Sequence, residues 1–595
     1  MSGLVEGLEW VLLSLIPGAL SWRTGNSAYA SWMAPLVMGC LGLAIGLLVL
    51  GVARMVRRPL AWDSGLVAIV TFSGAYLTAT LQGQVFSEVA ALLLAAGITA
   101  VITRWYRGDR ERLQRFMLRS LPALIGLVLL LAGTTTGWRH LAEQRAMAAL
   151  PAPPDGALNV LLLVLDTQRA DHLSMYGYAR PTSPRLDAFA LESVRYDNAQ
   201  SSSSWTLPSH ASLFTGEPLS RHRAGVMGRP FLDGRFPTLA ERLRASGWAT
   251  GGFIANTFWT GRNTGLARGF AHYEDFYGNP GDALARTTIG RRMAYEVLPR
   301  LGRDDVPGRK WAPTLNRDLL QWLDGLHGRP FFAFVNYFDV HSPLKPVAPF
   351  AGRFRPLDAT GRTSREIDLG AIGTSVELPS PERIAELVDR YDESILGLDD
   401  ALGALFDQLK ERGLLERTIV IVTADHGESW GEHGMIYHGH SLYREQTHVP
   451  LLVHWPGREH AGTVVRSPVG IDQIPATVAA AVQLSGVAFP GKALPLADDS
   501  TASVRTELAR RSAVPSNWPA SRGSVAGVIE GPWHYIEEES GSAELFDVSN
   551  DSLERNNLAG DTAHAALGTS FSAQLSRALA GSGLSWPSRA GRGTP

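Results

Sequence analysis

The chain has 595 residues, a net charge of -2 and one cysteine, Cys40. This length leaves room for more than one domain, and a net charge so close to zero gives no general attraction to nucleic acid. One cysteine also excludes a disulfide bond within the chain.

Uncharged stretches mark the N-terminal region as a predicted membrane domain. About 20 consecutive apolar residues span a bilayer. The stretches with at most one charge are residues 10–22, 33–53, 64–87, 84–103, which carries Glu88, and 120–138. The first of these is short and reaches spanning length only with its flanking residues. We therefore predict about five transmembrane helices within residues 1–138, with the lipid bilayer as a partner and no cleavable signal peptide.

The placement of arginine predicts how this domain is oriented. Three arginines follow the second stretch over residues 54–58, and six lie over residues 104–119, between the fourth and fifth stretches. Because basic loops stay on the cytoplasmic side, the N-terminus is expected inside and everything after Trp138 outside. We expect a multi-pass cell-membrane protein whose remaining domains are extracytoplasmic, either periplasmic or extracellular.

A proline-rich linker over residues 139–158 is predicted to precede an α/β domain over residues 159–500. Short apolar runs there are typical of strands that are buried on both faces. These runs are Val160–Leu165, Ala249–Ala255, Phe331–Phe338, Thr418–Thr423 and Val449–Trp455. Pro381–Gly413 is predicted as a long helix, because its apolar residues fall on one stripe. This alternation favours a mostly parallel sheet with helices on both faces, in which ligands bind beyond the carboxyl ends of the strands.

The C-terminal part of the chain has a different pattern. Val528–Glu537 and Glu544–Asp547 are predicted to contain short strands of a small β subdomain over residues 501–575. The tail over residues 576–595 is rich in Ser, Gly and Arg, and we expect it to be loose.

Three motifs in the α/β domain carry ligands for one divalent metal. Asp166 follows the first predicted strand, Asp425 and His426 follow the strand Thr418–Thr423, and Thr206 lies in a Ser/Thr-rich loop. Two carboxylates, an imidazole and a hydroxyl suit Zn²⁺ or Mn²⁺ better than Mg²⁺ or Ca²⁺. We predict that Asp166, Thr206, Asp425 and His426 hold the metal. Taken singly, each aspartate is as well explained as a helix cap or a turn residue.

Thr206 is the candidate nucleophile. A free hydroxyl is a weak nucleophile unless a base or a metal removes its proton, and a metal at its oxygen also neutralises charge on the ester. The alternative is that Thr206 caps a helix that starts near Pro208. Both roles can hold together, because the N-terminus of a helix favours an anionic substrate.

Together and in this order, the motifs resemble the sulfatase family of the alkaline phosphatase superfamily over about residues 159–560. In that family the nucleophile motif is Cys or Ser, any residue, Pro, Ser, Arg, and the Cys or Ser is oxidised to formylglycine. Here the stretch is Thr206-Leu-Pro-Ser-His210, and a Thr cannot form that aldehyde. In its Thr the chain is similar to the phosphoethanolamine transferases, lipoteichoic acid synthases and nucleotide phosphodiesterases of the superfamily.

The resemblance implies roles for further residues. His341 and Lys345 lie in a segment that resembles the one whose His contacts the ester oxygens, and His440, or alternatively His438, stands where a lysine contacts the ester. His210 replaces the arginine of the nucleophile motif. The expected catalytic residues are Thr206, His341 and His440, and the expected substrate-binding residues are His210, Lys345, His438 and Arg169. Structural roles are the alternative for His210 and Lys345.

The resemblance also bears on the metal. Sulfatases bind Ca²⁺ and usually have a second Asp after the first, and often an Asn in place of the His. Here Thr167 and His426 stand at these positions, which favours Zn²⁺ or Mn²⁺ over Ca²⁺. A second metal site is an open alternative, built from the histidines after Gly431 together with Asp339.

We predict a metal-dependent hydrolase that cleaves sulfate or phosphate esters outside the membrane through a covalent intermediate on Thr206. Its substrate is an anionic ester, with lipids and glycans among the candidates, and no nucleic acid is expected as a partner. One alternative is a transferase that moves a phospho-headgroup onto a lipid or an envelope glycan. The other is a catalytically inactive membrane scaffold.

Overall fold

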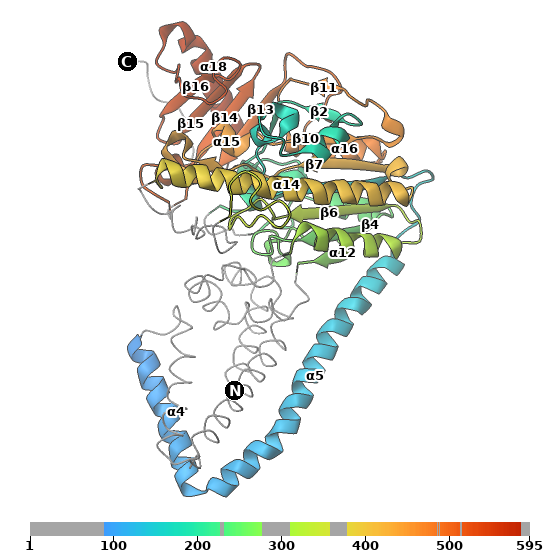
Figure 1. Cartoon of the computed structure of the whole chain (residues 1–595), viewed down its shortest axis with the longest axis vertical. Helices are drawn as coiled ribbons and strands as arrows, with labels where there is room; N and C mark the ends of the chain where they lie inside the picture. The colour runs from blue at the N-terminus through green and yellow to red at the C-terminus, as the bar shows by residue number, and fades with distance from the viewer. Residues whose placement is uncertain are drawn as a thin grey trace. The chain divides into compact units, whose positions relative to one another are not determined.

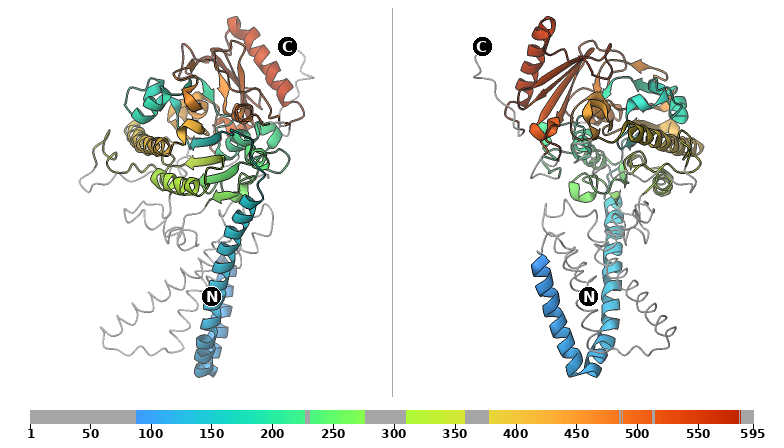
Figure 2. Two further views of the ribbon diagram at one scale, coloured as in Figure 1. Left: turned by 90° about the vertical axis from the view of Figure 1, so that its right-hand side faces the viewer. Right: turned by 60° about the vertical axis from the view of Figure 1, so that its left-hand side comes forward.

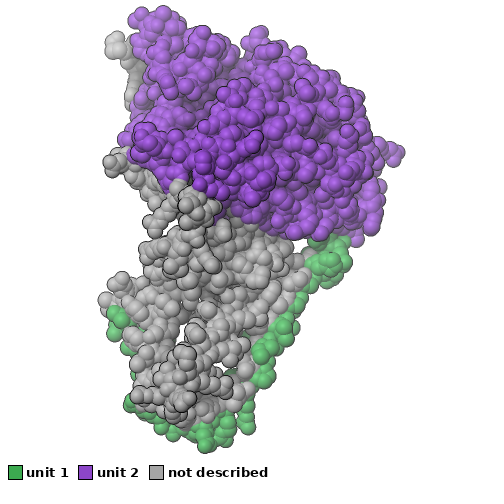
Figure 3. Space-filling view, in the orientation of Figure 1, with its two compact units in different colours: residues 1–145, 276–309 green, residues 146–275, 310–595 purple. Residues whose placement is uncertain are grey.

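A computed structural model describes residues 88–226, 231–275, 310–357, 378–484, 486, 488–511, 514–582 and 584 of the chain. The chain divides into two compact units (Figure 3). One comprises Met1–Arg145 and Phe276–Arg309, and the other comprises Ala146–Asp275 and Lys310–Pro595. The larger unit contains both of the sheets described below.

Two long helices make up the described part of the first unit. They are α4 (Glu88–Gly108) and α5 (Arg110–Ala148), whose last residues belong to the second unit. The predicted basic loop over residues 104–119 is therefore wrong, because only Asp109 separates the helices and the arginines lie on them. Arg, Glu, Gln and Leu all favour helix, which explains the difference.

No helix among the described residues has both the length and the apolar character needed to cross a membrane. The predicted transmembrane segments 10–22, 33–53 and 64–87 lie outside the described residues.

The second unit is built on an eight-stranded sheet in the order β11-β2-β10-β7-β1-β6-β4-β5 (Figure 1). Its strands are β1 (Asn159–Leu165), β2 (Val194–Tyr196), β4 (Ala249–Ile254), β5 (His272–Glu274), β6 (Phe331–Tyr337), β7 (Thr418–Thr423), β10 (Leu451–His454) and β11 (Val464–Val465). The strands from β7 to β5 are all parallel, as predicted. β10 runs antiparallel to β7 and β2, because the chain returns from β7 without the long crossover helix that a parallel strand needs.

Helices lie on both faces of this sheet. The described α-helices between residues 184 and 522 are α6 (Pro184–Ala190), α7 (Thr206–Thr215), α8 (Leu219–His222), α9 (Leu239–Ala245), α12 (Ala312–Asp324), α14 (Pro381–Glu411), α15 (Arg444–Thr447), α16 (Ile474–Ala481) and α17 (Pro519–Arg522). Alternate side chains of β6 point to opposite faces. Phe334 contacts Phe214 of α7, whereas Phe331 contacts Trp322 of α12. The sheet therefore separates a layer that contains α7 from a layer that contains α12.

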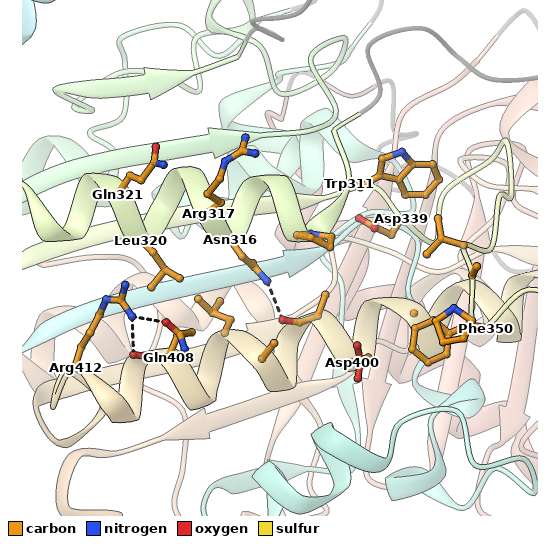
Figure 4. A pocket seen from close by; sticks show the side chains of 18 of the residues that line it. Trp311, Asn316, Arg317, Leu320, Gln321, Asp339, Phe350, Asp400, Gln408 and Arg412 are labelled. Carbon is orange, nitrogen blue, oxygen red and sulfur yellow. Dashed lines mark hydrogen bonds between the residues drawn. The ribbon is translucent and has the colours of Figure 1, made fainter.

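The long predicted helix is α14, which packs beside α12 (Figure 1). Ser380 begins it by accepting the backbone N–H of Arg383, and Gly413 follows its end with a φ of 63°. A cavity of about 710 Å³ lies between α12 and α14 (Figure 4). At its edge, Asn316 Nδ2 donates a hydrogen bond of 2.8 Å to Ala401 O and joins the two helices.

A second sheet of four antiparallel strands forms the C-terminal region. It consists of β13 (Ser503–Leu508), β14 (Val525–Glu530), β15 (Trp533–Glu538) and β16 (Ala543–Asp547), and α18 (Ala565–Leu579) packs against it (Figure 2). The stretch Val528–Glu537 thus spans the turn of a hairpin. α18 extends beyond the predicted start of the loose tail, because Phe571, Leu575 and Leu579 are buried against the sheet. The rest of the tail, residues 585–595, lies outside the described residues.

The remaining strands are two-residue pairs. β3 (Ala199–Gln200) pairs with β12 (Val469–Gly470), and β8 (Ser429–Trp430) pairs with β9 (Ile436–Tyr437). The second pair follows directly on the motif Asp425-His426-Gly427 and fixes the start of the histidine-rich segment.

Candidate functional site

The two predicted aspartates lie side by side at the carboxyl edge of the large sheet. Asp166 follows β1 and Asp425 follows β7, and these strands pair in parallel with Val164 opposite Thr423. The parallel register carries both chains past the same edge, where ligands bind in such sheets. Asp166, Asp425 and His426 are all buried, and their ligand atoms lie within 4.8 Å of one another.

Thr206 lies next to this cluster. It is the first residue of α7, and its Oγ1 lies 3.1 Å from His426 Nε2. The second ring nitrogen of His426 lies 2.9 Å from Gly427 O, which holds the imidazole with Nε2 directed toward Thr206. The structure thus brings together the four residues predicted to hold the metal.

In each aspartate, one carboxylate oxygen is hydrogen-bonded and the other is available to a ligand. Asp166 Oδ2 accepts from Asn256 at 2.8 Å, and Asp425 Oδ1 accepts the backbone N–H groups of Thr167 and His426 at 3.2 and 3.0 Å. Asp166 Oδ1 and Asp425 Oδ2 are buried and have no hydrogen-bond partner among the described residues. A buried oxygen left in this way is costly unless a ligand satisfies it. These residues fit a divalent cation, with Asp166, Asp425 and His426 as its ligands.

The electrostatics of the cluster point the same way. Burial, reinforced by the neighbouring Asp425, raises the pKa of Asp166 to about 8, and burial raises the pKa of Asp425 to about 7. Burial also lowers the pKa of His426. Two buried acids and a neutral imidazole form a site in which a cation replaces protons.

Thr167 stands where the family usually has a second acidic residue. It adopts a φ of 64° and donates its backbone N–H to Asp425. Its hydroxyl donates to Asp166 O at 2.7 Å, so the side chain is used within the loop. Thr167 positions the cluster through its backbone.

Two of the predicted histidines lie next to the cluster. The ring of His438 lies 4.3 Å from that of His426 and 5.2 Å from that of His341. His440 lies on the same segment as His438, is 2% exposed, and has no hydrogen-bond partner for either ring nitrogen among the described residues. The roles of His341, His438 and His440 toward an ester stay predictions.

His210 lies on the same helix as Thr206. One turn along α7, its Nδ1 lies 2.8 Å from Thr206 O, and the same nitrogen lies 3.6 Å from Asp425 Oδ2. Burial lowers its pKa to about 4, so the ring is neutral at physiological pH. These contacts tie the first turn of α7 to the aspartates and give His210 a positioning role.

Arg169 is buried and engaged in ion pairs. Its guanidinium forms ion pairs of 2.7 Å with Asp171 and with Glu432, and it donates to Glu428 O at 3.0 Å. This arrangement fits a structural role better than the predicted substrate-binding one. Lys345 is half-buried in the loop that also carries His341, and its role stays a prediction.

The second metal site finds no counterpart among the described residues. The only group of three metal-ligating side chains found there is Asp166, Asp425 and His426. Asp339 accepts the backbone N–H of Ala312 at 3.0 Å and lines the cavity between α12 and α14 (Figure 4). His433 stacks on Tyr443 and lies 3.1 Å from Glu445, which gives it a structural place.

Sequence reasoning missed Glu428 and Asn256. Glu428 is fully buried, and its Oε1 lies 3.0 Å from His438 Nδ1. Burial raises the pKa of Glu428 well above its usual value, and burial together with the nearby His426 lowers that of His438. The position of Glu428 just after Asp425-His426-Gly427 was a usable signal. Asn256, two residues beyond β4, offered only its place at a strand end.

The sulfatase family model matches residues 158–484. The chain is 27% identical over 482 residues, 69% of this chain and 92% of the relative, to the multifunctional alkaline phosphatase superfamily protein PehA of Trinickia caryophylli. It is 24% identical over 63% of its length and 77% of the relative to the choline-sulfatase of Rhizobium meliloti strain 1021.

A solved structure shares the fold. The phosphonate monoester hydrolase of Agrobacterium radiobacter superposes with a TM-score of 0.57 at 21% identity, over 71% of this chain and 95% of that one. The matched region includes Asp166, Thr206, Asp425 and His426, and the family model alone covers more than half of the sequence. The chain belongs to the sulfatase family of ester hydrolases.

Proposed function

We propose that the chain is a metal-dependent hydrolase that cleaves sulfate or phosphate esters through a covalent intermediate on Thr206. The observation that supports this most strongly is the place of Thr206 Oγ1, 3.1 Å from His426 Nε2 in the buried cluster of metal-ligating residues. The similarity to a choline-sulfatase supports the ester class.

The chain's own residues position and accept the transferred group. A divalent cation at Asp166, Asp425 and His426 would supply the positive charge that stabilises the nucleophilic oxygen and the ester oxygens. Thr206 begins α7, so the backbone N–H groups of the first turn also favour an anion there. With its hydroxyl proton released to solvent, Thr206 Oγ1 forms the bond to sulfur or phosphorus while the bond to the alcohol oxygen breaks. Water then cleaves the ester on Thr206, and a proton from solvent restores the hydroxyl.

The departing alcohol oxygen needs a proton, and the pair of Glu428 and His438 can supply it. The pair is buried, and burial raises the pKa of the Glu428 carboxyl well above its usual value and lowers the pKa of the His438 imidazole, which favours the proton on Glu428 over the proton on His438. His438 can pass a proton to the leaving oxygen and take one back from the attacking water. His341, stacked on Phe338 at 4.1 Å, is the second candidate for this proton transfer.

Transfer to an alcohol is a second candidate function. A Thr206 ester reacts with any hydroxyl that reaches it in place of water, whereas a hydrated formylglycine would expel its sulfate without an acceptor. The Thr at this position also favours phosphoester over sulfate chemistry. Tracing a labelled phospho-headgroup into water or into an acceptor lipid distinguishes hydrolysis from transfer.

The test of the proposal is a panel of 4-nitrophenyl sulfate, phosphate monoester and phosphodiester, with chelator and with Zn²⁺, Mn²⁺ or Ca²⁺ added back. We expect cleavage of at least one ester, lost on chelation. Thr206→Val should reduce kcat by about a thousandfold or more, while Thr206→Ser should retain most of it. Equal activity of Thr206→Val and the wild-type protein would overturn the proposal.

We also propose that residues 1–138 anchor the enzyme in the cell membrane with its α/β domain extracytoplasmic. The uncharged stretches and the arginine placement support this. The protein should stay with the membrane after extraction at alkaline pH and be digested by protease added from the outside. Release into the soluble fraction would contradict the anchoring, and protection from external protease would contradict the orientation.

A further inference from the structure

The C-terminal region contributes a cation to the site. Arg511 follows β13, and its guanidinium carbon lies 3.5 Å from the centroid of the Trp205 ring, the residue directly before the nucleophile. A guanidinium this close to the face of a Trp ring is attracted to it, which restrains the position of the side chain. The side chain is thus held flat against the start of the nucleophile helix.

Backbone contacts fix Arg511 in this place. Its own N–H donates to Ala520 O at 2.7 Å, and Ala520 N–H donates to His440 O at 2.9 Å. Gly439 makes room for the stack, because a Cβ added there would lie 2.2 Å from Arg511 Nη1 and 2.4 Å from Trp205 Cε3. The close approach is therefore built into three segments that are distant in sequence.

The charge of Arg511 has no counter-ion among the described residues. No carboxylate forms an ion pair with its guanidinium there, in contrast to Arg169, which has two. Of the five N–H groups of the guanidinium, only one on Nη1 has an acceptor in the described part of the chain, Gly439 O at 3.2 Å. Burial lowers the pKa of Arg511 to about 10, so the group still carries its charge at neutral pH.

The surroundings of Arg511 are aromatic and uncharged. Trp518 packs on His440 with ring centroids 4.4 Å apart, and Trp259 contacts Trp205 edge-on at 5.1 Å. Burial and the nearby Arg511 lower the pKa of His440 well below its usual value, so this ring adds no positive charge. A guanidinium among flat rings suits a ligand that has an apolar or ring-shaped body and an oxyanion.

We propose that Arg511 binds a second oxyanion, carried by the alcohol part of the ester, so that the preferred substrate has one negative group that is cleaved and another that is recognised. This inference rests on the proposed function. The cluster at Thr206 takes the transferred group, while Arg511 stands against Trp205, Gly439 and the His440 segment. It therefore lies where the leaving alcohol, rather than the transferred group, is expected.

The test compares two esters of the class that the protein cleaves in the panel. One is the 3-carboxy-4-nitrophenyl ester and the other is its 3-carboxamide analogue, which matches it in shape but lacks the charge. For the wild-type protein, kcat/KM should be at least about tenfold higher for the carboxylate, mainly through a lower KM. Arg511→Gln should bring this ratio close to one, and Arg511→Lys should leave an intermediate ratio.

A matched control is Arg510→Gln. Arg510 is exposed, precedes Arg511 directly, and donates only to Ser521 O among the described residues. It should keep the wild-type ratio. If Arg511→Gln lowers kcat/KM equally for both esters, or if the wild-type protein shows no preference for the carboxylate, the inference is wrong.

A measurement on the wild-type protein alone guards against a variant that does not fold. The product 5-hydroxy-2-nitrobenzoate should inhibit at least about tenfold more strongly than the corresponding benzamide, and equal inhibition would overturn the inference. Failure of the proposed function is distinguishable, because no ester would then be cleaved at all. Failure of this inference leaves cleavage intact without charge preference.

Discussion

At the scale of single residues, the candidate metal cluster depends on side chains that hold its carboxylates in place. Asn256 donates to Asp166 Oδ2 at 2.8 Å and orients the carboxylate so that Oδ1 faces the cluster. Partners of this kind affect metal affinity by about 10–100-fold. We expect Asn256→Ala to weaken metal binding by that factor in competition with a fluorescent chelator. Asn556→Ala, at an exposed position, should leave the affinity unchanged, and an equal effect of both would contradict this account.

Protons should compete with the metal at the same carboxylates. Their pKa values are raised to about 8 for Asp166 and about 7 for Asp425, so both are increasingly protonated as the pH falls below these values. Metal binding must then displace protons, and the apparent Kd should rise about five-hundredfold between pH 8 and pH 6. Titration calorimetry in buffers of different ionisation enthalpy measures both the affinity and the protons released. A Kd that is constant over this range would show that the carboxylates are already ionised without metal.

The residues that sequence reasoning found are those that follow an apolar strand or a Ser/Thr-rich loop. Asp166, Asp425 and His426 are visible because a buried strand that ends in a carboxylate is unusual. Asn256 and Arg511 were missed because neither stands in a pattern of its own. Arg511 reaches Trp205 across about 300 residues of sequence, and nothing local to either residue predicts the contact.

At the scale of elements, α14 supports its neighbour through a buried carboxylate. Asp399 Oδ2 accepts the backbone N–H of Arg185 and Oδ1 that of Leu186, each at 2.8 Å, and so caps the start of α6. We expect Asp399→Ala to lower the free energy of unfolding by about 1–3 kcal/mol, because a buried and a partly buried donor lose their acceptor. Urea denaturation measures this. Asp400 is exposed, so Asp400→Ala should lower the free energy of unfolding by less than about 0.5 kcal/mol. A similar loss in both variants would argue against the cap.

Element type was predictable where the apolar pattern was long and continuous. β1, β6, β7 and α14 match their predictions within a few residues because their buried faces fix the period. The direction of β10 was not predictable, because the same apolar run can form a parallel or an antiparallel strand. The path of the chain between β7 and β10 determines which of the two forms. The helical course of residues 110–119 was missed because arginine-rich stretches occur in loops and helices alike.

At the scale of the whole molecule, metal binding should be coupled to folding of the second unit. The cluster draws its residues from strand ends and helices far apart in the sequence, so the unfolded chain has no equivalent site. A metal at about 100 times its Kd should add about 2.7 kcal/mol to the free energy of unfolding. Thermal melting with and without chelator shows this as a rise in Tm. Asp166→Asn should remove most of the rise, and an unchanged rise would place the metal elsewhere.

The α/β domain was predictable from the order of the motifs, because Asp166 and Asp425 each follow a strand and the carboxyl ends of parallel strands lie along one edge of the sheet. The membrane domain rests on uncharged stretches that lie largely outside the described residues, so its prediction stands on composition alone. The sequence leaves hydrolysis and transfer open, because a Thr206 ester is common to both and the acceptor is not encoded in the motifs.

The most direct measurement is mass spectrometry of the tryptic peptide that contains Thr206, after the reaction is quenched with acid during turnover. Trypsin should release Tyr196–Arg221, which contains Thr206. The account predicts a fraction of this peptide heavier by about 80 Da for a sulfate or phosphate monoester, with the added group on Thr206, and a larger mass for a headgroup diester. The adduct should be absent from Thr206→Val. An unmodified peptide under conditions where substrate is being cleaved, or an adduct on another residue, would contradict the account.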